Sequence, residues 1–355
     1  MRIIHTADLH LESSFIRLTP EQVKERKLEL YSAFTRMVDE AVRLGARLFI
    51  IAGDLFDTEK ITKRAAERVT SVIERHPEID FLYLQGNHEG SAFLDKISVM
   101  PRNLRTFGDG WTSYDYGDVT VVGRNTLSEG MFGELRLNPE RHNIAVLHGA
   151  VREYSGAGDG ISLPDAARCG IGYLALGHYH AYGEYRLDGG GYAVYSGSPE
   201  GRGFDETGEH GFVVIDTDTG KICPRFVASA KRRVHAVEVD ISEAHDTLLS
   251  EDAVAAAVRD IPSSDLVRVI LVGERAPEAR TDTDRIAARF KDRFYYFEVK
   301  DATRVKIDPM SYAYDKSLKG EFIRMVYSRT DLTDEMRTKI IKCGISALMG
   351  EELEV

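Results

Sequence analysis

The chain has 355 residues, of which 43% are hydrophobic and 29% are charged, and its formal net charge is −11. This composition is ordinary for a globular protein, and the length suffices for two or three domains with a substantial core. No apolar run approaches the roughly 18 residues needed to cross a bilayer, so we expect no membrane contact. The acidic balance favours solubility and does not exclude a nucleic-acid partner, because metal ions can neutralise phosphate locally.

The N-terminal sequence MRIIHTADLH leaves no room for a signal peptide before the first polar motif. The three cysteines, Cys169, Cys223 and Cys343, are far apart and form no C-x-x-C pair. This argues against a disulfide framework and against a structural zinc knuckle. Both observations predict a cytoplasmic protein.

Predicted strands and helices alternate over roughly the first 220 residues. Thr19-Pro20 opens a helix that runs to about Leu44 and stops at Gly45, because Pro suits a first helical turn and Gly a C-terminal cap. A second helix covers about residues 63–75. Strands are predicted at RIIHTA (2–7), RLFIIAG (47–53), FLYLQG (81–86), VTVVG (119–123), NIAVLHG (143–149), YLALG (173–177), YAVYSGS (192–198) and GFVVID (211–216). The pattern predicts an α/β (mixed α+β) class, with two packed sheets and helices outside them.

The character of the sequence changes near residue 230. Short strands and helices alternate over 231–306, which predicts a small separate α+β unit. Residues 307–355 are mostly helical. The apolar faces predicted there consist of Leu318, Phe322, Met325 and Val326 on one helix, and of Met336, Ile340, Ile341, Ile345 and Leu348 on the next. We therefore predict three parts, with boundaries 1–230, 231–306 and 307–355.

One local stretch is basic within this acidic chain. Residues 221–237 contain five Lys or Arg and no acid: Lys221, Arg225, Lys231, Arg232 and Arg233. The stretch is either a phosphate-facing patch or a solvated connector, and the sequence leaves both interpretations open.

Five predicted strands end in polar side chains of the kind that bind metals. The strand ends are Asp8-Leu9-His10, Gly53-Asp54, Gly86-Asn87-His88, His148-Gly149 and Gly177-His178-Tyr179-His180. Four of them carry a glycine beside the polar residue, which lets backbone and ligand approach closely. Each motif alone could be a turn or a buried polar residue. Together they predict one site, because sites in α/β sheets form at the carboxyl ends of strands.

The residue types at these ends select the chemistry. Carboxylate, imidazole and amide oxygen without thiolate suit Mn²⁺, Fe²⁺ or Zn²⁺ better than a structural zinc cage. The ligands are too many for one ion, so we expect two, and two neighbouring ions serve the hydrolysis of phosphate esters. The sequence has no G-x-G-x-x-G after the first strand, no P-loop and no G-x-S-x-G, which disfavours nucleotide-cradling folds and serine hydrolases.

The motifs DLH, GDLFD, GNHE, LHG and GHYH, in this order over residues 1–200, resemble those of the calcineurin-like metallophosphoesterases. ADLHLESSF and YSGSPEGRGFDETGEHGFVVID are similar to the Mre11/SbcD branch of DNA repair exonucleases, and most of all to the bacterial YhaO type. The resemblance implies a metallophosphoesterase two-sheet sandwich flanked by helices. It also implies that residues 231–306 are a small α+β capping domain that guides DNA, followed by a helical C-terminal tail.

The resemblance implies a role for each matching residue. The first metal would be held by Asp8, His10, Asp54 and His180. The second would be held by Asp54, Asn87, His148 and His178, with Asp54 bridging. His88 would act on the scissile phosphate, as a proton donor or a transition-state stabiliser.

Asp57 departs from the pattern, because some nuclease relatives have a second histidine at this place. The carboxylate would orient His88 or cap the following helix. Tyr154, Tyr179 and Tyr182 are expected near the site, in packing or in substrate stacking.

The resulting hypothesis is a DNA exonuclease with two divalent ions, most simply Mn²⁺, acting in DNA repair or processing. The unit after residue 230 and the basic stretch favour a polymer substrate, with Lys231, Arg232 and Arg233 as DNA contacts. An SMC/Rad50-like coiled-coil ATPase would bind the tail, and a homodimer is left open. The alternatives are a small-molecule or nucleotide phosphodiesterase or phosphatase, and a binding scaffold with a dead metal site.

Overall fold

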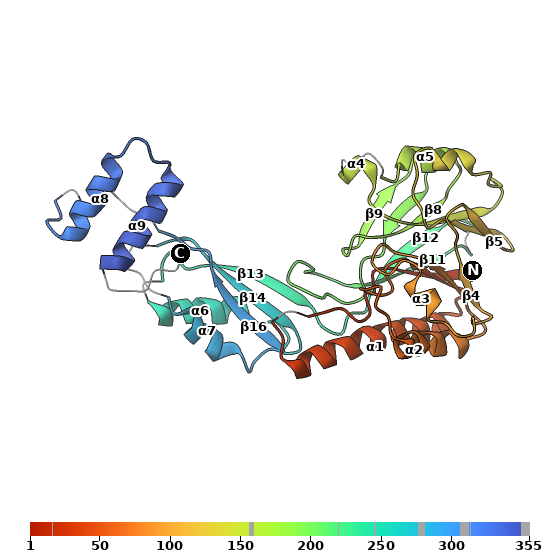
Figure 1. Cartoon of the computed structure of the whole chain (residues 1–355), viewed down its shortest axis with the longest axis horizontal. Coiled ribbons are helices and arrows are strands. Elements are labelled where there is room, and N and C mark those ends of the chain that lie inside the picture. Colours follow the sequence, from red (N-terminus) through yellow and green to blue (C-terminus); the bar gives the residue numbers. More distant parts are fainter. Residues whose placement is uncertain are drawn as a thin grey trace. The chain divides into compact units, whose positions relative to one another are not determined.

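The computed structural model describes residues 1–15, 17–155, 160–218, 220–244, 246–275, 281–305, 312 and 314–348. The chain divides into two compact units, Met1–Val234 and His235–Val355, which are described separately (Figure 1). The predicted division into three parts stays a prediction. Within the described ranges, no helix is both long enough and apolar enough to traverse a membrane.

The first unit contains a six-stranded sheet with the order β12-β11-β1-β2-β3-β4. Its strands are β1 (Arg2–Thr6), β2 (Leu48–Ala52), β3 (Asp80–Leu84), β4 (Leu104–Thr106), β11 (Gly211–Asp216) and β12 (Cys223–Ala228). Strands β1 to β4 run parallel, and β11 and β12 are antiparallel additions at one edge. The predicted connector in the basic stretch is thus partly a strand, since its residues 223–228 form the edge strand β12.

A second six-stranded sheet has the order β5-β6-β7-β8-β10-β9. Its strands are β5 (Thr112–Tyr116), β6 (Val119–Gly123), β7 (His142–His148), β8 (Tyr173–Gly177), β9 (Gly183–Arg186) and β10 (Tyr192–Tyr195). Short helical segments accompany it: the 3₁₀ turn η1 (Met131–Glu134), α4 (Arg152–Ser155) and α5 (Leu163–Arg168).

Side-chain alternation in β2 shows how the two sheets and the helices are layered. Ile50 belongs to the apolar core that joins this sheet to Ile144 and Tyr173 of the second sheet. Its neighbours Phe49 and Ile51 instead belong to the core under the helices. All five residues of β2 are buried, because each face of the strand has a layer against it. The predicted two-sheet sandwich flanked by helices is confirmed.

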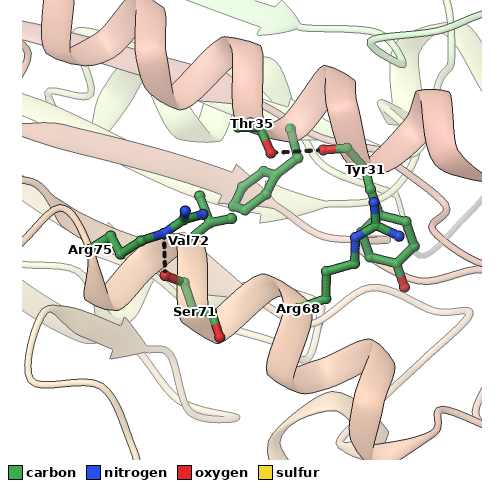
Figure 2. Close-up of a pocket in the computed structure, with 7 residues that line it drawn as sticks. Tyr31, Thr35, Arg68, Ser71, Val72 and Arg75 are labelled. Carbon is green, nitrogen blue, oxygen red and sulfur yellow. Dashed lines mark hydrogen bonds between the residues drawn. The ribbon is translucent and has the colours of Figure 1, made fainter.

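Helices α1 (Pro20–Leu44), α2 (Lys63–Glu74) and α3 (Ala92–Asp95) accompany the first sheet. The predicted limits of α1 are confirmed: Thr19 and Gln22 form a capping box, and Gly45 ends the helix with a left-handed φ of 64°. Figure 2 shows the groove between α1 and α2, a cavity of about 420 Å³. In it the Arg68 guanidinium lies over the ring of Tyr31, 4.0 Å from its centroid.

The second unit contains a three-stranded sheet, β13-β14-β16, with a separate two-stranded pair, β15 and β17. The strands are β13 (Val234–Asp240), β14 (Leu266–Val272), β15 (Glu274–Arg275), β16 (Tyr296–Asp301) and β17 (Arg304–Val305), with helices α6 (Thr247–Ala257) and α7 (Thr283–Phe290). Val254 of α6 and Ile286 of α7 are fully buried in one core with Val267 and Val269 of β14. The three-stranded sheet and its two helices agree with the strands and helices that the sequence predicted over 231–306, whereas the pairing of β15 with β17 was not predicted.

Helices α8 (Leu318–Ser328) and α9 (Asp334–Leu348) pack against each other through a small core of Ile323, Val326, Ile341 and Ile345. As a result, some of the apolar residues of α8 that were predicted to contact a partner are buried against α9, and the others are exposed. Val326 is buried, and Phe322 contacts Gly344, where an added Cβ would lie 2.1 Å from the phenyl ring. Leu318 and Met325 remain 68% and 60% exposed. Val326 is therefore not exposed to a partner and Phe322 is only partly exposed, and the partner surface itself stays a prediction.

Candidate metal centre

The ends of strands from both sheets meet at one place in the first unit. After β1 and β2, the amide of His10 donates to the carbonyl oxygen of Asp54 at 3.0 Å. From the second sheet, the His148 ring reaches across, and its Nδ1 lies 2.9 Å from the carbonyl oxygen of Ala52 at the end of β2. The predicted metal-type residues are therefore neighbours in space as well as members of a sequence pattern.

A first group of ligand atoms comes from Asp8, His10 and His180, and these atoms lie within 4.8 Å of one another. The Nε2 atoms of His10 and His180 are 3.1 Å apart. Asp8 and His10 are fully buried. Two imidazole nitrogens and a carboxylate that converge in a buried position form the donor set that a divalent cation binds.

A second group of ligand atoms comes from Asp8, Asp54 and His148. Oδ2 of Asp54 lies 3.3 Å from His148 Nε2 and 3.7 Å from His10 Nε2, so this carboxylate stands between the two groups. Oδ1 of Asn87 lies 2.8 Å from the same nitrogen of His148. This intermediate position is the one that a bridging carboxylate requires.

His178 lies beside the groups without joining them. Its backbone amide donates to both carboxylate oxygens of Asp8 at 3.0 Å, and its ring centroid is 5.5 Å from that of His148. The geometry therefore places all seven predicted ligand residues around one centre, with the His178 imidazole at its edge.

Four of the predicted ligands have strained backbones. The φ angles of Asp8, His10, Asp54 and His178 are 53°, 46°, 48° and 109°, in the region that non-glycine residues rarely adopt. Such conformations cost about 1–3 kcal/mol each and cluster at functional sites, where the surrounding structure enforces them.

Glycines beside the ligands are required by space, as the sequence predicted. A Cβ on Gly86 would lie 1.9 Å from Oδ1 of Asp54, and a Cβ on Gly53 would lie 2.3 Å from Nδ1 of His148. A Cβ on Gly177 would meet the carbonyl oxygen of Ala52 at 2.1 Å. No side chain can be added at these positions without displacing a candidate ligand or its support.

Asp57 joins the candidate acid–base residue to the ligands. Its Oδ1 lies 2.8 Å from His10 Nδ1, 3.5 Å from His88 Nδ1 and 3.1 Å from Arg202 Nη1. The following helix is capped by Thr62 instead, so the capping role considered for Asp57 is wrong. Its position is that of a residue that orients both histidines.

Sequence analysis missed three charged residues that support the centre. Glu206 Oε1 lies 2.8 Å from Nδ1 of His180 and also accepts a hydrogen bond from Arg202. A carboxylate behind a ligating histidine fixes the ring and raises its basicity. Glu89 is fully buried and accepts hydrogen bonds from the amides of Leu55 and Phe56, which fixes the loop after Asp54. The GNHE and GRGFDE motifs contain these residues, but neither sequence pattern indicates burial.

The electrostatics of the centre favour cation binding. Burial raises the pKa of Asp8 to about 7. Burial would also raise the pKa of Asp54, but its hydrogen bond and charge interaction with His148 outweigh this and lower it to about 2. Burial lowers the pKa of His10 and of His178, which favours neutral imidazoles with free lone pairs. Burial also acts to lower the pKa of His148, but Asp54 and Asp8 outweigh it and raise that pKa to about 9, and the hydrogen bond with Glu206 raises the pKa of His180, so a bound cation would replace the proton on these two rings. The donor set therefore fits divalent metal ions.

Two open clefts meet at His178. One has a volume of about 450 Å³ and is lined by Asn87, His148 and residues 125–127. The other has a volume of about 570 Å³ and is lined by His180 and several tyrosines. His178 lines both clefts, so the candidate centre stands between two recesses. Tyr179 and Tyr182 line the second cleft, whereas the side chain of Tyr154 lies outside the described residues.

The predicted DNA-binding cations are paired with acids. Arg232 is 7% exposed, and its guanidinium lies 2.9 Å from Glu29 of α1. Lys231 also contacts Glu29, at 2.7 Å, and Arg233 pairs with Glu209. Burial argues against a DNA contact by Arg232, and the role of Lys231 and Arg233 stays a prediction.

Comparison with known proteins agrees with the geometry. The family model for calcineurin-like phosphoesterases matches residues 1–182. The metallophosphoesterase YhaO of Bacillus subtilis is 26% identical over 300 residues, which cover 78% of this chain and 73% of that protein. The DNA double-strand break repair protein Mre11 of Saccharolobus solfataricus is 24% identical over 343 residues, covering 88% and 85%.

Mre11 of Sulfurisphaera tokodaii is 27% identical over 215 residues, which cover 56% of this chain and 54% of that protein. The resemblance inferred from the motifs is confirmed. The chain belongs to the calcineurin-like phosphoesterase family.

Proposed function

We propose that this protein is a divalent-metal-dependent phosphodiesterase that degrades DNA, as an exonuclease of DNA repair or processing. Its family consists of metal-dependent hydrolases with a dinuclear centre. Two divalent ions, when bound, would supply Lewis acidity to the phosphate oxygens and a nucleophile derived from water. The side chains around the centre would bind the ions, orient the substrate and donate the proton to the leaving oxygen.

The proposed ligands of the two ions are those that the sequence indicated. Asp8, His10, Asp54 and His180 would hold one ion, and Asp54 would be shared with the second. Asn87, His148 and His178 would complete the second. Mn²⁺ is the proposed ion, with Fe²⁺ and Zn²⁺ as alternatives, because oxygen and imidazole donors accept all three.

His88 is the proposed general acid. Its side chain is 44% exposed, and Nε2 lies 3.9 Å from Oδ2 of Asp54, so the ring faces both solvent and the centre. Asp57 lies 3.5 Å from Nδ1 and would hold the ring with Nε2 directed at the substrate. From this position the ring would donate a proton to the leaving oxygen.

The meeting of two clefts at His178 carries the proposal of a diester substrate. A phosphodiester has an organic group on each side of its phosphorus, and each group needs space. A monoester needs one recess only. The names of the relatives, which include DNA double-strand break repair proteins, support DNA as the polymer.

One observation favours a nucleotide phosphodiesterase as the second candidate. The cations that sequence analysis assigned to DNA are paired with carboxylates, and Arg232 is buried by its pairing with Glu29. A small substrate would need no cationic track for a backbone.

A substrate panel separates these functions. The purified protein is assayed with Mn²⁺ or with EDTA on labelled duplex DNA, single-stranded DNA, bis(p-nitrophenyl) phosphate and p-nitrophenyl phosphate. The proposal expects Mn²⁺-dependent cleavage of DNA and of the diester. Activity on small diesters without DNA cleavage would support the nucleotide phosphodiesterase, and activity on the monoester alone would contradict both. Asp95→Ala, on the exposed side of α3, is the control for Asp54→Ala.

We also propose that helices α8 and α9 bind an SMC-like coiled-coil ATPase. The exposed apolar residues Leu318, Met325, Met336 and Ile340 are 68%, 60%, 50% and 37% exposed, respectively. An amphipathic helix presented to a partner groove is a common recognition mode. Met325→Asp should abolish co-purification with the ATPase and leave the nuclease unchanged. The same change at Phe322 is uninformative, because that ring packs inside the helical pair.

The cytoplasm is the proposed compartment. The three cysteines are free, and none is paired in a disulfide. A fluorescent fusion or cell fractionation checks this.

A further inference from the structure

The second cleft is aromatic. The cleft has a volume of about 570 Å³. Its lining includes the tyrosines Tyr179, Tyr182, Tyr185 and Tyr195 and the histidines His178 and His180 of the candidate centre. Whatever occupies this cleft therefore lies directly beside the reacting phosphate. The rings differ in what they do for the fold, and this difference identifies the one that is available to a ligand.

Tyr195 is a structural residue. It is 1% exposed, and its hydroxyl accepts a hydrogen bond from the amide of Val151 at 3.0 Å and donates one to the carbonyl oxygen of Gly149 at 2.8 Å. Tyr182 is also engaged, because its hydroxyl donates to Glu184 and its ring packs on Phe226 at 4.6 Å between centroids.

Tyr179 is engaged much less. Its side chain is 38% exposed, and its hydroxyl forms no hydrogen bond among the described residues. Its ring contacts the rings of His178 and Tyr195, with centroid separations of 5.4 and 4.9 Å. A partly exposed aromatic ring that neighbouring rings hold in place suits stacking, because its position is fixed before the ligand arrives.

The charges of the cleft select a neutral group. The lining includes Asp205 and Glu206 and contains no Lys or Arg. Arg202 compensates Glu206 through a 2.9 Å ion pair, whereas no ion pair of Asp205 occurs in the described part of the chain. A second phosphate is disfavoured beside Asp205, while a planar uncharged heterocycle meets the tyrosine face without electrostatic cost.

We propose that this cleft binds the nucleobase adjacent to the scissile phosphate and that Tyr179 stacks on that base. This rests on the proposed function, in that the substrate is a nucleotide diester. Tyr179 acts in binding and positioning, since stacking is sequence-tolerant and every base has a π face. Loss of one stacked base by alanine substitution weakens binding about 5- to 150-fold.

The test uses two diesters that differ only in the group placed in the cleft. Thymidine 5′-(p-nitrophenyl phosphate) carries a base, and methyl p-nitrophenyl phosphate does not. With Mn²⁺, Tyr179→Ala should raise KM for the thymidine ester about tenfold or more and change kcat little. The methyl ester should be hydrolysed as by the wild type. Tyr179→Phe should behave as wild type, because the hydroxyl has no partner to lose. Tyr314→Ala, at a 92% exposed position outside the cleft, is the surface control.

A second readout is independent of turnover. Thymidine 5′-monophosphate should bind Tyr179→Ala at least fivefold more weakly than the wild type, in the presence of EDTA as well as of Mn²⁺. Equal losses on both diesters, or unchanged affinity for the monophosphate, would overturn the proposal. If the wild type cleaves the thymidine ester but no DNA, the DNA function fails while the Tyr179 effect still decides the nucleobase site. Thermal melts of all variants exclude misfolding as the cause.

Discussion

The first unit contains two buried clusters of charged residues that differ in how their charges are balanced. The ionic cluster consists of Arg26, Glu29, Arg36, Glu200, Lys231 and Arg232, and the metal centre consists of the seven proposed ligands. In the ionic cluster, Glu29 lies between Arg26 and Arg232, and Arg36 contacts Glu200 at 2.7 Å. In the metal centre, Asp8 and Asp54 face imidazoles, and the nearby Arg202 pairs with Asp57 and Glu206.

This difference indicates that the ionic cluster stabilises the fold and that the metal centre binds a ligand. Guanidinium groups balance the carboxylates of the ionic cluster permanently, so the cluster needs nothing from outside. The metal centre has carboxylate and imidazole lone pairs directed at one another, and the nearby guanidinium of Arg202 is already paired with Asp57 and Glu206. Buried carboxylate and imidazole acceptors that converge in this way form a binding site for a metal cation from solution.

The largest effect is expected at the carboxylate between the two ligand groups. Asp54→Ala removes a ligand from both proposed ions, so metal content and hydrolysis should be lost together. Metal analysis by mass spectrometry and the Mn²⁺-dependent diester assay measure the two losses, and His10→Ala should be nearly as harmful. Wild-type activity in Asp54→Ala would contradict the shared position.

His88→Ala should separate binding from chemistry. The ring is outside the proposed ligand set, so two ions per chain should remain, while diester hydrolysis falls about 10²–10⁴-fold with loss of the general acid. Metal analysis and kcat on bis(p-nitrophenyl) phosphate are the measurements. A variant that also loses metal would make His88 a ligand or a structural residue.

In the ionic cluster, Glu29→Gln should lower the free energy of unfolding by about 1.5–3 kcal/mol, because it removes the charged acceptor that Arg26, Lys231 and Arg232 share, while Glu25 and Glu200 still face Arg232 and Arg26. Urea denaturation measures the change. Metal content and activity per folded molecule should be unaffected. Glu40→Gln is the matched control, since Glu40 pairs with Arg43 on the solvent side of the same helix, and its free energy of unfolding should hardly change. Equal effects of the two substitutions would remove the distinction between buried and exposed pairs.

The smallest effect is expected in the pH dependence of the difference in unfolding free energy between the wild type and Glu29→Gln. Burial alone would raise the pKa of Glu29, but hydrogen bonds from Arg232 and Lys231 outweigh it and hold the pKa below its ordinary value of 4.5. A carboxylate with a depressed folded-state pKa contributes stability above its unfolded pKa, and this is lost as pH falls through the folded pKa. The stability gap between wild type and Glu29→Gln should therefore be full at pH 6–7 and shrink below about pH 4.5. A gap that grows on acidification would reverse the assigned direction.

Local sequence was sufficient to predict that the proposed ligands lie close together, because each follows an apolar strand and the strand ends of the two sheets meet at one place. Their role as ligands stays a prediction. Local sequence did not predict the burial of charged residues where segments far apart in the chain contact each other. Arg232 belongs to a basic run that is typical of a solvated surface, and it is buried only because Glu29, some 200 residues earlier, lies against it. Glu206 and Glu89 were missed for the same reason, since nothing near them in sequence indicates burial.

The helical tail illustrates a further limit. The 3.6-residue period correctly placed Phe322 and Met325 on an apolar face, but a period does not say how much of that face the next helix covers. Helix α9 covers Val326 and part of Phe322 and leaves Met325 exposed. The width of the contact depends on how the two helices pack, and that information is in neither helix alone.

The left-handed backbones of Asp8, His10, Asp54 and His178 have an evolutionary consequence. At such positions glycine and asparagine are easier to accommodate than aspartate or histidine. A descendant released from selection for ion binding would gain stability by drifting toward those residues, and it would do so first where φ is most costly. We therefore expect the residues at these four places to distinguish family members that act on phosphate esters from those that have kept only the fold.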